Sequence, residues 1–133
     1  MKKVVKVTTL TTEEYRVVTS RELRELMKKE TKKYSIDEFG IPHLTSLFAV
    51  ETVGNIVAEK SFSTNPAGFE RTYWTVYRLD NDKCFVEMTM VRSDGIFNVI
   101  IESVADFDKI NTVEDVRKVC PNNICTLNDM LSK

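Results

Sequence analysis

Residues 71–104 constrain the fold of this chain more than any other segment, because they have the pattern of consecutive strands joined by short turns. Strands are predicted over residues 71–79, 83–92 and 96–104, where apolar and polar side chains alternate. Residues 80–82 form a three-residue connection, and Asp94 with Gly95 is a dipeptide that favours a two-residue hairpin turn. The segment therefore predicts a three-stranded antiparallel meander.

The lengths of the two turns predict how these strands pair. A three-residue connection pairs Leu79 with Lys83. A two-residue connection pairs Ser93 with Ile96. Both pairings send the same apolar side chains to one face, namely Trp74, Val76, Val86, Met88, Met90, Val99 and Ile101. A slip of one residue in either hairpin would move a whole strand's apolar set to the other face, so the agreement supports the prediction.

Two helices are predicted outside the meander. The longer one covers residues 20–34, where Thr19 and Glu22 have the spacing of a capping box and apolar residues recur at helical intervals. The shorter one covers about residues 112–120, with Thr112 or Asn111 as its cap and a proline directly after it.

The remaining segments have the composition of strands. Residues 2–10 and 14–19 are predicted as a hairpin, although Thr12 is also suited to cap a short helix in the second of them. Residues 46–63 are predicted as two strands that turn at Gly54 and Asn55, with a helix around residues 44–57 as the alternative.

The predicted fold class is α+β. An antiparallel sheet, made of the meander over 71–104 and additional strands, packs against one main helix over about 20–34. The short helix over about 112–120 lies at one end of it. The length of 133 residues and the ordinary share of hydrophobic residues predict a single domain, 1–133.

The composition predicts a soluble cytoplasmic protein. The longest run without a charge, with His43 taken as neutral, is residues 39–50, well short of the about 20 residues that a membrane-spanning helix needs. The first residues lack the apolar block of a signal peptide. The three cysteines, Cys84, Cys120 and Cys125, are an odd number and do not predict a disulfide framework.

No motif predicts catalysis, a metal or a cofactor. His43 is the single histidine, and the spacing of the cysteines does not match a zinc site. Residues 80–82 begin like a calcium loop but lack its later glycine and acidic positions. None of the glycines lies in a phosphate-binding loop.

Two groups of side chains are candidate binding surfaces. Tyr73, Tyr77 and Phe85 are predicted on the face of the meander opposite Trp74, where they would suit a protein interface unless another element covers them. The second group is Lys28, Lys29, Lys32 and Lys33, at the end of the predicted helix. These lysines would suit phosphate or an acidic protein, and a solvated helix end is the simpler interpretation.

The sequence thus favours a small non-catalytic protein that acts by contacting another protein, as an inhibitor or accessory factor. One alternative is a nucleic-acid-binding module that uses the four lysines. A second alternative is a ligand-binding protein or enzyme with a pocket between sheet and helix, lined by Trp74, Met88 and Cys84. No membrane partner is expected, and the sequence leaves the oligomeric state open.

Overall fold

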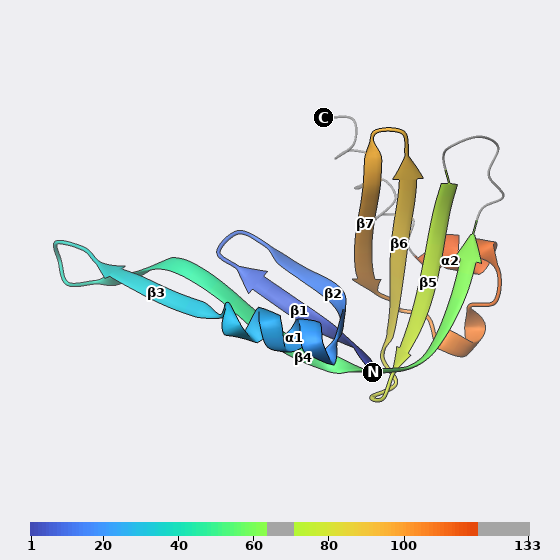
Figure 1. Ribbon diagram of the computed structural model, residues 1–133, viewed down its shortest axis with the longest axis horizontal. Coiled ribbons are helices and arrows are strands. Elements are labelled where there is room, and N and C mark those ends of the chain that lie inside the picture. The colour runs from blue at the N-terminus through green and yellow to red at the C-terminus, as the bar shows by residue number, and fades with distance from the viewer. Residues whose placement is uncertain (64–70, 120–133) are drawn as a thin grey trace. The chain divides into compact units, whose positions relative to one another are not determined.

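The computed structural model describes residues 1–63 and 71–119, and most of these form antiparallel β-strands (Figure 1). The strands are β1 (Lys2–Thr9), β2 (Glu13–Thr19), β3 (Thr31–Ile36), β4 (Pro42–Ser63), β5 (Arg71–Leu79), β6 (Cys84–Arg92) and β7 (Gly95–Glu102). The helices are α1 (Ser20–Lys28), the short 3-10 helix η1 (Phe107–Lys109) and α2 (Val113–Val119).

The chain forms two compact units, and the long strand β4 contributes to both. The first unit, Met1–Asn55, holds β1, β2, α1, β3 and the first part of β4. The second unit begins at Ile56 and holds the last part of β4 with β5, β6, β7, η1 and α2.

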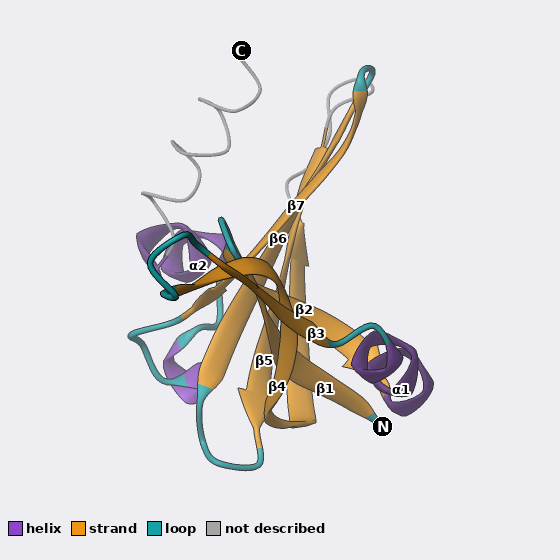
Figure 2. Cartoon of the chain, turned by 90° about the vertical axis from the view of Figure 1, so that its left-hand side faces the viewer, coloured by secondary structure: helices purple, strands orange, loops and turns teal. Residues whose placement is uncertain are grey.

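In the first unit, β1 lies between β2 and β4, and β3 pairs with the beginning of β4. The predicted hairpin over residues 2–19 is confirmed, with Lys2 opposite Thr19. Helix α1 packs beside β1 and β2 (Figure 2), because its apolar side has to be buried. The core of this unit consists of Val5, Val7 and Val18, with Leu23, Leu26, Phe48 and Val50 packed against them.

In the second unit, the end of β4 pairs with β5, and β5, β6 and β7 form the predicted meander. Trp74 lies opposite Met88, and Val76 lies opposite Val86, as the first turn predicted. The predicted apolar face is the core of the unit, and η1, α2 and the segment between them cover it through Phe107, Ile110 and Val116 (Figure 2).

The register of the second hairpin differs from the prediction by two residues. Gly95 pairs with Arg92, and Met88 therefore lies opposite Val99. The turn consists of Ser93 and Asp94, and Gly95 takes a φ of +146° that residues with a side chain rarely adopt. A shift of two residues keeps every side chain on its original face. The predicted and observed registers therefore give the same apolar face, and the apolar pattern does not distinguish them.

The predicted α+β class is wrong, because no main helix is present in the described residues and each unit is a sheet with a short helix. The helix predicted over 20–34 ends at Lys28, and Thr31–Ile36 form strand β3 instead. The reason is that residues 28–33 contain no apolar side chain. A helix continued through them would have had nothing to bury, whereas a strand there completes its hydrogen bonds along β4.

Residues 46–63 also differ from the prediction, because they belong to one continuous strand. Gly54 and Asn55 do not form a turn; Gly54 is buried within β4, opposite Val4. The pairing register shifts between Val4 and Val5, and again between Ile56 and Ala58. Such irregularities bend a strand and increase its twist without ending it.

Both predicted helix starts are confirmed. The Glu22 N–H donates to Thr19 Oγ1, and the Thr19 N–H donates to Glu22 Oε1, each at 3.1 Å. Thr112 and Asp115 form the same arrangement at α2, with the Asp115 N–H at 3.1 Å from Thr112 Oγ1. The end of this helix at residue 120, and Cys120 and Cys125, lie outside the described residues.

The burial of Ile110 in the core of the second unit predicts how much its substitution lowers the free energy of unfolding. Ile110 is 1% exposed, so Ile110→Ala should lower the free energy of unfolding by about 2–4 kcal/mol through lost burial and a cavity. Val104 is 99% exposed, so Val104→Ala should change it by less than about 0.5 kcal/mol. Urea unfolding followed by the fluorescence of Trp74, the single tryptophan, measures both. Equal effects would contradict the burial of Ile110.

Candidate functional site

The most exposed cluster of apolar side chains lies on the hairpin that β3 forms with the start of β4. Tyr34, Ile36, Phe39 and Ile41 are between 52% and 79% exposed, and we call them the hairpin patch. Figure 1 shows that this hairpin extends beyond β1 and β2 of the same unit. Large apolar side chains usually are buried, so several of them exposed on one short hairpin indicate a contact surface.

The hairpin has an apolar face and a polar face. Tyr34 pairs with Leu44, and Ile36 pairs with Pro42, so these residues share one face. Ser35, which pairs with His43, lies on the other face. Tyr34 and Ile36 therefore lie on one side of the two strands, and the other two residues of the patch, Phe39 and Ile41, lie at the turn that joins them.

Asp37 holds the turn between the two strands. Its Oδ1 accepts hydrogen bonds from the N–H groups of Phe39 and Ile41, both at 2.9 Å, and His43 Nε2 donates to its Oδ2 at 2.7 Å. Gly40 completes the turn with a φ of +79°. The bond from His43, followed by those from the backbone, lowers the pKa of the Asp37 carboxyl. The turn thus presents Phe39 and Ile41 on a backbone that is already ordered.

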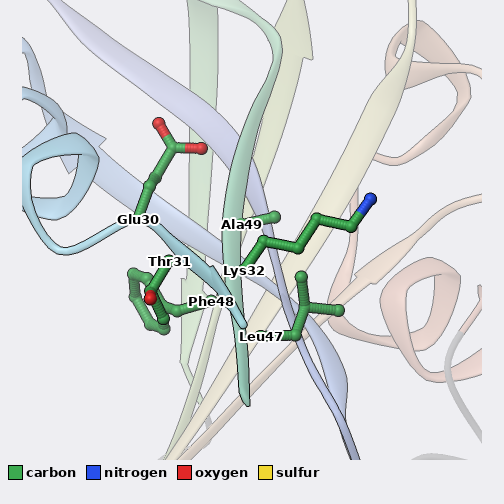
Figure 3. Close-up of a pocket in the computed structure, with 6 residues that line it drawn as sticks. All are labelled: Glu30, Thr31, Lys32, Leu47, Phe48 and Ala49. Carbon is green, nitrogen blue, oxygen red and sulfur yellow. The ribbon is translucent and has the colours of Figure 1, made fainter. Parts of the chain in front are cut away.

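An open groove of about 300 Å³ lies at the base of the hairpin (Figure 3). Its lining residues are Glu30, Thr31, Lys32, Leu47, Phe48 and Ala49. Figure 3 shows Lys32, Leu47 and Ala49 pointing to one side, and Thr31 and Phe48 to the other. Alternation along β3 places Lys32 on the same face as Tyr34, and its Nζ lies 5.8 Å from the centre of that ring. The apolar face of the hairpin therefore continues into the groove.

The aromatic residues predicted as a binding surface are mostly buried. Tyr77 and Phe85 lie opposite each other on β5 and β6, as predicted, but both are buried, and Tyr73 is half-buried. The Tyr77 hydroxyl donates to Glu87 Oε1 at 2.8 Å. Burial, together with this carboxylate, raises the pKa of Tyr77. Neither Tyr77 nor Phe85 is accessible for stacking in this structure.

The four lysines do not share a helix end. Lys28 and Lys29 lie at the end of α1, where Lys28 Nζ is 3.2 Å from Glu25 Oε1, while Lys32 and Lys33 belong to β3. Neighbouring residues of a strand point to opposite faces, so Lys32 and Lys33 face different sides of the hairpin.

In the second unit, Lys60 has structural hydrogen-bond partners. Lys60 Nζ donates to the carbonyl oxygens of Phe107 and Ile110, at 2.9 and 3.2 Å, and so holds the segment around η1. Cys84 is buried, which raises the pKa of its thiol and keeps it protonated. Trp74, Met88 and Cys84, predicted to line a pocket in one alternative, are all part of the core cluster.

Within residues 1–63 and 71–119, no three His, Cys, Asp or Glu side chains come together as metal ligands. No helix in that part of the chain is both long enough and apolar enough to cross a membrane. Searches of protein-family models, curated proteins and solved structures find no match to this chain.

The sequence contained a signal for this hairpin that the helix prediction obscured. Tyr34 and Ile36 alternate with polar residues, and Asp37 and Gly40 have the composition of a turn. Phe39 and Ile41 within such a turn are unusual, because turn residues usually are polar.

The role of Asp37 can be tested by substitution. Asp37→Ala removes the acceptor of the Phe39 and Ile41 N–H groups, so amide exchange at both residues should accelerate by roughly tenfold. NMR-detected hydrogen exchange measures this change. Glu38→Ala, at the exposed neighbouring position, is the control and should leave both rates unchanged.

The stability of the same turn should depend on pH. Because the pKa of Asp37 is lowered in the folded hairpin, the charged carboxylate stabilises the turn above its unfolded pKa of about 3.9. That contribution is lost as the pH falls through the lower, folded value. The amide chemical shifts of Phe39 and Ile41 should therefore titrate below pH of about 4. A midpoint above that value would contradict the assigned hydrogen bonds.

Proposed function

We propose that this chain is a small non-catalytic binding protein that acts as an inhibitor or accessory factor of another protein, and that the hairpin patch is its contact surface. The observation that carries the proposal is the exposure of Tyr34, Ile36, Phe39 and Ile41 on one ordered hairpin. Aromatic and large aliphatic side chains of this kind dominate the affinity of protein interfaces when a partner covers them.

The order of the turn supports binding as well. Because Asp37 already fixes the backbone around Phe39 and Ile41, a partner does not have to order that loop. Binding therefore avoids part of the entropy loss that a flexible loop would incur.

The cytoplasm is the compartment that we propose for this activity. Three cysteines are an odd number, and Cys84 is a buried free thiol, both of which suit a reducing environment. Nucleic acid remains the second candidate partner through Lys32 and Lys33, but the apolar character of the patch favours protein.

The proposal can be tested by capture of partners from native lysate on the tagged full chain. Ile36→Glu with Phe39→Glu places two charges in the patch and should weaken capture by about 2 kcal/mol or more, the cost of removing hot-spot residues. The control is Ile96→Glu with Val104→Glu. Ile36 and Ile96 are equally exposed, at 72%, and the control pair belongs to the second unit.

Two results of this experiment would contradict the proposed function. If the patch variant retains its partner as well as the control variant does, the hairpin is not the contact surface. If nuclease treatment of the lysate releases everything that is captured, the partner is nucleic acid and the protein-binding proposal is wrong. A protein that stays bound after nuclease treatment, and is lost only from the patch variant, supports the proposal.

A further inference from the structure

Strand β3 lies at the edge of its sheet. Among the described residues it pairs with β4 alone, so its other side offers backbone N–H and C=O groups to a further strand. An extended segment of another protein can add to such an edge, with main-chain hydrogen bonds supplying affinity and side-chain pockets supplying specificity.

The charges on this edge select among such segments. Lys32 and Lys33 are consecutive and exposed, and each points to a different face of the hairpin. Opposite charges that face each other across paired strands stabilise the pairing, while like charges destabilise it. Two adjacent acidic residues on the incoming strand would therefore meet both lysines at once.

The apolar face of the hairpin sets a second requirement for the strand that pairs with β3. Tyr34 and Ile36 follow Lys32 on one face, and the groove beside Lys32 contains Leu47 and Ala49. A strand that pairs with β3 would contact this face with every second side chain. Those side chains should be apolar.

We infer that the outer edge of β3 binds an extended segment of the partner protein that carries two adjacent acidic residues beside apolar residues at alternate positions. This inference rests on the proposed function, because it names the partner's chemistry at the same hairpin. A second copy of this chain is a poorer occupant, since its own β3 would bring two more lysines to the edge.

A library of random decapeptides displayed on phage tests the inference on the full-length protein. Selection should enrich an Asp or Glu pair beside alternating apolar residues. With Lys32→Glu and Lys33→Glu, selection should switch to a basic pair. The control, Lys109→Glu with Lys118→Glu, carries the same change of charge at exposed positions in the second unit and should keep the acidic preference.

A synthetic peptide of the selected sequence tests the mode of binding. Its affinity should fall by roughly tenfold or more in the Lys32→Glu, Lys33→Glu variant, since two attractive cross-strand pairs become repulsive. Amide exchange of β3 should also slow when the peptide binds, because strand addition gives its outward N–H groups acceptors.

The outcomes separate this inference from the proposed function. Selection without an acidic preference, or binding without slower exchange in β3, overturns strand addition at this edge. Capture from lysate that is still lost in the Ile36→Glu, Phe39→Glu variant would then leave the proposed function in place. Capture that is indifferent to those substitutions overturns the proposed function itself.

Discussion

The pairing of β4 is the interaction on which the sheets of both units depend. Its residues pair with β3 near its start, with β1 in its middle and with β5 near its end. In the part of the chain that the structure describes, the pairs that form without it are β1–β2, β5–β6 and β6–β7. Each of these three pairings contains a shift in register, between Lys33 and Tyr34, between Val4 and Val5, and between Ile56 and Ala58. Gly54 is buried beside the shift between Val4 and Val5, a position typical of glycine in a strand.

The sequence predicted local features well where short-range chemistry decides them. The Thr19–Glu22 capping box and the first turn of the meander depend on residues three or four positions apart, and both are as expected. The faces of the meander were also correct, because alternation is a strong signal. The exact register of the second hairpin was not, since two registers that differ by two residues satisfy the same alternation.

Features that depend on distant residues were predicted poorly. The segment after Lys28 has both helical and extended interpretations, and its pairing with residues 42–48 decides between them. The burial of Tyr77 and Phe85, which were predicted as a binding surface, could not be read from the sequence, because alternation assigns a face but not what covers it. The hairpin patch was missed because residues 31–34 had been included in a helix. Once β3 is assigned as a strand, alternation places Tyr34 and Ile36 on one face, while their exposure is known only from the structure.

The hydrogen bonds of Asp37 influence which sequence changes the turn can tolerate. Its carboxylate bonds to the backbone of Phe39 and Ile41 and not to their side chains. The shape of the loop is therefore largely independent of which side chains occupy those positions. Single substitutions at residues 38, 39 and 41 then change the side chains that the loop exposes while the hairpin keeps its conformation. The side chains of this loop can therefore vary, in nature or in the laboratory, without a compensating change elsewhere in the fold.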